Sequence, residues 1–349
     1  MYSEHYGLSG QPFQLTPDAR FWFESRTHRR AMAYLGFGLA QSEGFVVVTG
    51  EIGAGKSTLA AHLLATIDRS RLNAISIVST QVEGDDVLRL TAQGLGVATR
   101  GVEKAALLDA VEKRLDEETR AGKRNLLIVD EAQNLPVSAL EELRMLSNYQ
   151  LRGRPLLQIL LLGQPEFRDK LASPGLEQLR QRVIASHHLE AMGADEVEAY
   201  VAHRLALVGW SGRPAFSADA YAALHKASGG IPRKVNQLAN RVMLQAAVDN
   251  ADRIEGALVE AVAQEIEADA PSAAAPAQAT EKVLPLRSVR AAAPAPVAQT
   301  AVDLELADRI AKLEAQAAEQ EETLRRVLTL LVEWVEKDAP ELGYRVNAA

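Results

Sequence analysis

The chain of 349 residues contains no cysteine, which excludes disulfides, thiolate nucleophiles and cysteine-based zinc sites. Its seven histidines show no HxxxH or HxH spacing, so no histidine metal motif is present. Apolar runs such as LLQILLLG (156–163) fall well short of the ~18 residues that a membrane helix needs. The opening MYSEHYGLSGQPFQ lacks the basic and apolar regions of a signal peptide. We therefore expect a cytoplasmic protein.

Positive charge is also scarce. The formal net charge is −8, and no run of Lys or Arg is longer than two residues. This balance does not suit a protein whose main surface tracks nucleic acid. The hydrophobic share of 47% and charged share of 24% are those of an ordinary globular protein with a real core.

The composition predicts several segments. Residues 1–190 read as an α/β domain, and residues 191–268 read as a small helical domain. Residues 269–302 are rich in Ala and Pro, so they cannot bury enough side chain to fold and read as a disordered linker. A heptad-patterned helix follows at 303–336, and a tail completes the chain at 337–349.

Short apolar runs alternate with amphipathic segments in the first of these domains. Such alternation predicts a mainly parallel sheet covered by helices on both faces. From residue 194 onward we expect helices alone. The predicted strands are FVVVT (45–49), AISIV (74–78), LLIVD (126–130), LLQILLL (156–162) and VIASHHL (183–189). The predicted later helices are 194–208, 217–226, 232–248 and 254–267, with Ser217 as an N-cap and Pro232 in a first turn.

The segment after the linker carries apolar residues at alternating spacings of four and three, which is a heptad pattern over about four heptads. A polar Gln320 interrupts it and could set the register. We expect a coiled coil that self-associates or binds a partner helix, and the alternative is one amphipathic helix docked on the globular part. The positions are Leu306, Ile310, Leu313, Ala317, Gln320, Leu324, Val327, Leu331 and Trp334.

Residues 50–57, GEIGAGKS, match the pattern G-x-x-x-x-G-K-[ST]. Glycines in such a loop let backbone N–H groups converge on phosphate oxygens, Lys56 would reach the β- and γ-phosphates, and the Ser57 hydroxyl would bind Mg²⁺. The alternative is a glycine-rich turn with an accidental lysine, but a strand candidate precedes the loop and a helix pattern follows it. The predicted nucleotide-binding residues are Gly50, Glu51, Ile52, Gly53, Ala54, Gly55, Lys56, Ser57 and Thr58.

LLIVDEAQNL (126–135) places two acids directly after a buried strand. Ligands of open α/β sheets bind at the carboxyl ends of their strands. Asp130 could hold Mg²⁺ there, and Glu131 could orient and deprotonate a water for attack on the γ-phosphate. The alternative is a surface pair of helix-capping acids. A water-activating carboxylate favours a hydrolase or motor over a small-molecule kinase.

Four further polar residues are candidates. Gln164, in LLLGQPEF, lies just beyond another strand and could touch the γ-phosphate or the attacking water, although Gly-Gln-Pro is also good turn chemistry. Arg180 and Arg182 precede the last strand and could stabilise transition-state charge at a neighbouring subunit's nucleotide, or be ordinary surface arginines. Arg233, in GGIPRKVNQL, opens a helix of the second domain and could reach back to the γ-phosphate.

This order of motifs resembles the AAA+ ATPases. The resemblance implies that Lys56 and Ser57 are the Walker A lysine and hydroxyl, and that Asp130 and Glu131 are the Walker B pair. It further implies that Gln164 is sensor 1, where Asn or Thr is commoner, and that Arg233 is sensor 2. It places the arginine finger at Arg180 or Arg182 without choosing between them. The implied cofactors are ATP and Mg²⁺, and the helical domain becomes a lid over the nucleotide.

The N-terminus is similar to the general secretion pathway protein A (ExeA-like) group. The similar runs are Tyr6–Leu8, Pro12–Phe13, Thr16–Asp18, Phe21–Phe23 and His28–Ala33, together with VDEAQNL, GQPEF and GGIPRKVNQL. The resemblance covers about residues 1–265. Within the group, the chain looks most like the ATPase associated with exosortase/PEP-CTERM exopolysaccharide loci. The group's founding type has a membrane span and a peptidoglycan-binding region; in their place we find the linker and the heptad helix.

Together these features lead us to expect a cytoplasmic AAA+ ATPase that drives assembly or regulation of an envelope export or exopolysaccharide apparatus. We expect a homo-oligomer, a protein partner bound through the C-terminal helix, peripheral association with the inner membrane and no nucleic acid. One alternative is a nucleic-acid-linked ATPase of the transposition target-selection type, which carries similar VDEAQ motifs. Another is a slow nucleotide switch or scaffold that works by oligomerising.

Overall fold

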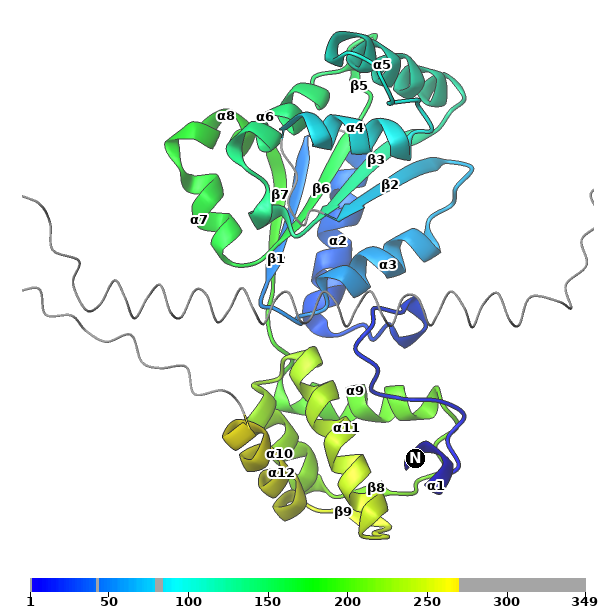
Figure 1. Ribbon diagram of the computed structural model, residues 1–349, viewed down its shortest axis with the longest axis vertical. Helices are drawn as coiled ribbons and strands as arrows, with labels where there is room; N and C mark the ends of the chain where they lie inside the picture. Colours follow the sequence, from blue (N-terminus) through cyan, green and yellow to red (C-terminus); the bar gives the residue numbers. More distant parts are fainter. Residues whose placement is uncertain (1, 42–43, 79–83, 270–349) are drawn as a thin grey trace, which may run out of the picture. The chain divides into compact units, whose positions relative to one another are not determined.

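The structure is a computed structural model of the chain, and it describes residues 2–41, 44–78 and 84–269 (Figure 1). The described residues all fall within one compact unit. Across these three ranges, no helix combines the length and the apolar character that spanning a bilayer requires. The predicted linker beyond Asp269, the heptad helix at 303–336 and the tail at 337–349 lie outside the described residues, so they stay predictions.

A five-stranded parallel sheet forms the first half of the unit, with the strand order β2-β3-β6-β1-β7. All five predicted strands are present. Their bounds are β1 Phe45–Gly50, β2 Leu72–Val78, β3 Arg124–Asp130, β6 Gln158–Gly163 and β7 Val183–Leu189.

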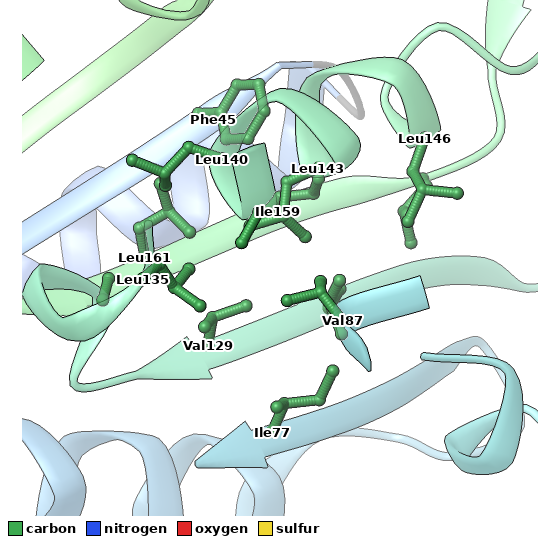
Figure 2. Close-up of a cluster of buried hydrophobic side chains, with 14 of the residues drawn as sticks. Phe45, Ile77, Val87, Val129, Leu135, Leu140, Leu143, Leu146, Ile159 and Leu161 are labelled. Carbon is green, nitrogen blue, oxygen red and sulfur yellow. The ribbon is translucent and has the colours of Figure 1, made fainter. Parts of the chain in front are cut away.

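The central strands are buried on both faces, which explains why they read as unbroken apolar runs. Along β1, Val46 and Val48 pack under one helical layer, while Phe45 and Val47 pack under the other, as the period of two requires. Figure 2 shows buried side chains of the second layer, where Phe45 and the leucines of α6 belong to one hydrophobic cluster. The first layer is α2 Arg26–Gln41 and α3 Lys56–Thr66; the second is chiefly α4 Gly84–Gly94, α5 Lys104–Arg120 and α6 Val137–Leu146.

Parallel pairing brings the carboxyl ends of all five strands to one edge of the sheet. The segments after β1, β3 and β6 therefore lie side by side, although more than 100 residues separate the first from the last. Ligands of open α/β sheets bind at this edge. Shorter elements complete this half: η2 Ala132–Asn134, β4 Gln150–Leu151, β5 Arg154–Pro155, α7 Glu166–Ala172, η3 Pro174–Leu176 and α8 Glu177–Arg180.

The helical lid follows, and we use this name for residues 194–269. It consists of α9 Ala194–Ala206, α10 Ala218–Ser228, α11 Pro232–Val248 and α12 Gly256–Asp269. The hydroxyl of Ser217 accepts a hydrogen bond from the N–H of Ala220 and caps α10 as predicted. The expectation of helices alone was wrong, because β8 Ala215–Phe216 pairs in parallel with β9 Arg253–Ile254. The last helix accordingly starts two residues later than predicted.

The N-terminal segment packs differently from the prediction, which placed it in the α/β domain. It contains α1 Tyr2–His5 and η1 Ala19–Phe21. Its buried aromatic residues share one core with the lid. The hydroxyl of Tyr2 donates to Oδ1 of Asn240 at 2.6 Å, and the hydroxyl of Tyr6 donates to the carbonyl of Ala251 at 2.9 Å. The segment thus crosses from the lid core to the start of α2.

Candidate nucleotide-binding site

The loop between β1 and α3 has the backbone shape of a phosphate cradle. Gly53 and Gly55 have φ angles of 86° and 100°, in the left-handed region that favours glycine. Helix α3 begins at Lys56, so its free N–H groups and the positive end of its dipole point into the loop. The predicted order of strand, loop and helix is therefore present at residues 45–66.

Lys56 lies inside this loop and is 5% exposed. Its Nζ donates to the carbonyls of Gly50 at 2.7 Å and Glu51 at 3.0 Å. Burial lowers the pKa of the ammonium, and the carboxylates of Glu131 and Asp130 act in the opposite direction. An anionic group in the loop would offset the cost of burying this cation, which suits a phosphate.

Ser57 and Asp130 come together from different elements. The Ser57 hydroxyl at the start of α3 donates to Oδ2 of Asp130, at the end of β3, over 2.5 Å. Hydroxyl and carboxylate oxygens are ligands that Mg²⁺ prefers, and these two stand beside a loop that fits phosphates. The residues present therefore fit a magnesium nucleotide.

Glu131 follows with a φ of 55°, a left-handed conformation that is unusual for glutamate. Its Oε2 accepts hydrogen bonds from Nε2 of Gln133 at 2.5 Å and Nε2 of Gln164 at 3.2 Å. The backbone N–H of Gln164 donates in turn to Oε1 of Gln133 at 3.0 Å. The predicted Gln164 is thus brought to Glu131. Sequence reasoning missed Gln133, although it stands in the same DEAQ run.

Arg233 is brought to the loop from the lid. Its backbone N–H donates to the carbonyl of Gly53 at 3.1 Å. A Cβ on Gly53 would lie only 2.3 Å from the Cβ of Arg233, so the loop has to be glycine at this contact. The side chain of Arg233 lines the same cleft as Lys56 and Ser57.

Arg180 and Arg182 are not brought to this site. Val183 pairs with Phe45 at the start of β1, so both arginines lie at the edge of the sheet opposite the loop. Five residues of strand correspond to roughly 17 Å. Arg180 donates to the carbonyl of Ala172 at 3.4 Å, and Arg182 donates to Oγ of Ser147 at 3.2 Å. Neither reaches the chain's own loop.

A cleft joins the loop, the N-terminal segment and the lid, and we call it the nucleotide cleft. It is open to solvent, and its lining comes from the phosphate loop, the N-terminal segment, α9 and α11. The lining combines the polar groups of the loop with aromatic, apolar and polar side chains of the N-terminal segment and the lid. Besides the loop, its lining includes Gln14, Leu15, Thr16, Pro17, Asp18, Phe21, Trp22, Phe23, His28, Met192, Tyr200, Arg204 and Asn236. Most of these were missed, because they come from distant segments.

His28 fixes the N-terminal segment to the loop. Its Nδ1 lies 2.7 Å from Oγ of Ser25, and a Cβ on Gly55 would approach its Nε2 to 2.7 Å. Burial lowers the pKa of the ring to about 4, so it is neutral at pH 7. Trp22 meets this ring edge-on at 5.0 Å and stacks on His62 of α3 at 4.3 Å.

Comparison with known proteins agrees with this geometry. Residues 39–171 match the family model of an AAA domain, which spans the loop, Asp130, Glu131 and Gln164. Over 246 residues, or 70% of its length, the chain is 36% identical to the General secretion pathway protein A of Aeromonas hydrophila. Residues 39–171 thus form an AAA domain of the P-loop type. The predicted P-loop fold is confirmed with it.

Within the AAA+ family, the predicted resemblance to the secretion pathway protein A group is also confirmed. The aligned region covers 45% of the Aeromonas protein, so the chain spans less than half the length of this relative. The finer resemblance to an exosortase-associated ATPase stays a prediction.

Solved AAA+ structures share the fold. The ORC2 protein of Aeropyrum pernix matches with a TM-score of 0.55 at 16% identity, covering 75% of this chain and 74% of that one. CDC6P of Pyrobaculum aerophilum matches with a TM-score of 0.59 at 15% identity, covering 73% of this chain and 70% of that one. At these identities the likeness concerns the fold alone.

Proposed function

We propose that the chain binds MgATP in the nucleotide cleft and hydrolyses it to ADP and phosphate. One observation carries this proposal: the Ser57 hydroxyl lies on the Asp130 carboxylate, in the same cleft as Lys56 and Glu131. A phosphate cradle alone would fit any nucleotide-binding protein. The added pair of oxygen ligands and the adjacent carboxylate supply what hydrolysis needs.

Each residue has a separate task in this proposal. Lys56 would exchange its carbonyl partners for phosphate oxygens, and Ser57 and Asp130 would hold a magnesium ion, which would neutralise phosphate charge. Glu131 keeps one carboxylate oxygen outside its glutamine contacts, and this oxygen accepts the proton of the attacking water. Arg233 adds a cation from the lid, so that lid position and phosphate state depend on each other.

We also place this ATPase in the assembly or regulation of an envelope export apparatus, including the exosortase-associated exopolysaccharide type. Its relation to a secretion pathway protein of Aeromonas hydrophila supports this placement. In this proposal the chain forms a homo-oligomer, binds a protein partner through residues 303–336 and works at the cytoplasmic side of the inner membrane.

Two variants test the catalytic proposal. Lys56→Ala should abolish ATP binding, whereas Glu131→Gln should bind ATP as wild type does and lose at least about 100-fold in turnover. Lys234→Ala is a matched control, because this exposed lysine stands next to Arg233 and does not line the described cleft. Full activity of Glu131→Gln would overturn the assignment. Very slow wild-type turnover together with ATP-dependent assembly would instead favour a nucleotide switch.

A further inference from the structure

A buried polar chain links the lid to the N-terminal segment beside the nucleotide cleft. Arg204 of α9 is 6% exposed, and its guanidinium donates to the Tyr200 hydroxyl at 2.9 Å. It also donates to the carbonyls of Pro12 at 2.6 Å and Gln14 at 3.2 Å. A guanidinium has no acceptor, so every one of these bonds runs outward from the arginine.

The direction of the Arg204 hydrogen bond determines the direction of the hydrogen bond between Tyr200 and Asn236. The Tyr200 hydroxyl carries a single hydrogen, and it accepts from Arg204, so its own hydrogen is free to donate. Its second neighbour is the carboxamide of Asn236, 2.9 Å away. The atom of Asn236 that faces Tyr200 must therefore be the oxygen. Arg204 thus decides, through Tyr200, which way round the Asn236 amide lies.

The amide nitrogen of Asn236 takes no part in these hydrogen bonds. Asn236 is 6% exposed and lines the nucleotide cleft. Its one hydrogen bond among the described residues uses the oxygen, so the two N–H hydrogens have no protein acceptor there. This nitrogen is not among the buried atoms left without a partner, so it opens on the cleft, where an acceptor on a bound ligand can reach it.

The position in the cleft indicates which part of the ligand this is. Asn236 follows Arg233 by three residues, just under one turn of α11, and the backbone N–H of Arg233 contacts the phosphate loop. Aromatic rings surround its partners: Tyr200 meets Phe23 edge-on at 5.5 Å, and the Arg204 guanidinium lies 4.5 Å from the centre of the Phe21 ring. With phosphates on the loop, these rings would offer the planar base of the nucleotide a surface to lie against.

We propose that Asn236 is a specificity-determining residue that donates a hydrogen bond from Nδ2 to a ring nitrogen of a purine base. The proposal rests on ATP binding in the nucleotide cleft and adds the atom-level selection of the base. Because the oxygen is engaged by Tyr200, the amide can offer only hydrogens. A base with an N–H at this edge would leave two donors facing each other and would bind more weakly.

Deaza analogues of ATP test this without any mutation. The dissociation constants of 1-deaza-, 3-deaza- and 7-deaza-ATP should be compared with that of ATP on the wild-type chain. One analogue, the one lacking the contacted nitrogen, should bind about 5- to 10-fold more weakly than the other two. Equal binding of all three would overturn the proposal. Loss of ATP binding by the wild type would instead overturn the proposed function, and this inference with it.

A variant then assigns the loss to Asn236. Asn236→Ala should weaken ATP binding by the same factor and should bind the discriminated analogue as wild type does. Tyr200→Phe keeps the ring but removes the hydroxyl that orients the amide, and it should reproduce part of this loss. Asn240→Ala is the matched control on the same helix, because its partner is Tyr2. An Asn236→Ala penalty that is equal for ATP and all three analogues would mean a structural role and would overturn the proposal.

Discussion

The backbone N–H of Arg233 donates to the carbonyl of Gly53 over 3.1 Å, which joins the first turn of a lid helix to the phosphate loop. The contact uses main-chain atoms on both sides, so it leaves the arginine side chain free to respond to the nucleotide. It also means that the lid cannot swing away without changing the loop. We therefore propose that nucleotide state and lid position are coupled at this pair of residues.

Arg233→Ala tests this coupling. The main-chain contact remains in the variant, so folding and ADP binding should be close to wild type. Loss of the cation should lower ATP turnover by about 10- to 100-fold, in line with one phosphate-directed charge. Steady-state ATPase assays and ADP titration measure the two effects, with Lys234→Ala as the neighbouring control. Unchanged turnover in Arg233→Ala would show that the Arg233 side chain has no role in ATP hydrolysis.

Gln133 offers a second test, since its amide donates to Oε2 of Glu131 and its oxygen accepts from the N–H of Gln164. It therefore holds both the base and the neighbouring strand end. In Gln133→Ala the carboxylate loses its shorter hydrogen bond and its orientation, so kcat should fall by about 10-fold while the Kd for ATP stays unchanged. If kcat instead rises, the glutamines restrain Glu131 rather than position it.

The magnesium assignment is tested at Asp130. Asp130→Asn keeps the size of the side chain but removes the charge that a divalent cation needs. Wild type should bind ATP more tightly with Mg²⁺ than with EDTA, and Asp130→Asn should show the same weak affinity in both conditions. Titration calorimetry in the two buffers gives this comparison. A variant that still gains affinity from Mg²⁺ would exclude Asp130 as a ligand.

Sequence alone could predict the sheet, because each strand carries its own apolar run, and it could predict the loop, because GEIGAGKS contains its whole chemistry within eight residues. It failed where the structure depends on contacts between distant segments. Tyr2 and Tyr6 were predicted to belong to the α/β domain but pack on the lid. An aromatic residue in a sequence indicates that it will be buried, but it does not indicate which segment it will be buried against. The pairing of Phe216 with Ile254 is also too short to leave a strand pattern.

In the site, too, the sequence predicted residues in local motifs but not contacts between distant segments. Lys56, Ser57, Asp130 and Glu131 stand in local motifs that specify strand ends, so their convergence followed from parallel pairing. His28 has no such motif around it, and the geometry of its ring depends on how α2 crosses the loop. In the sequence it stands out only as part of the run His28–Ala33, which belongs to the family resemblance.

His28 leads to a pH prediction. In the folded chain its pKa is about 4, and an ordinary histidine titrates near 6.5, so the unfolded chain binds a proton that the folded chain excludes. Stability should therefore fall as the pH drops from 6.5 toward 4, by up to about 3 kcal/mol from this residue. Above pH 6.5 the residue contributes no pH dependence. Urea midpoints of wild type and His28→Gln between pH 4 and pH 8 measure the difference. Parallel curves for the two proteins would show that His28 is not the group responsible.

The structure distinguishes between Arg180 and Arg182, the two candidates for the arginine finger. Arg180 and Arg182 both lie at the edge of the sheet opposite the chain's own loop, so either can act only on the nucleotide of another subunit. Arg182 is hydrogen-bonded to Ser147, whereas Arg180 is half exposed and lies 3.9 Å from Glu177. Arg180 also donates to the carbonyl of Ala172, but it is the more exposed of the two cations. We therefore expect Arg180→Ala to lower turnover by about 1,000-fold or more, with Arg182→Ala closer to wild type.

Mixing subunits separates a finger from a residue that merely supports the fold. Arg180→Ala keeps an intact nucleotide cleft, and Lys56→Ala keeps an intact Arg180, so each supplies what the other lacks. Neither should hydrolyse ATP alone, but an equimolar mixture should recover a measurable fraction of wild-type activity, because mixed assemblies place Arg180 of one subunit at the working cleft of the next. A mixture that stays inactive, with both variants folded and assembled, would exclude Arg180 from that role. Recovery with Arg182→Ala in its place would transfer the role to Arg182.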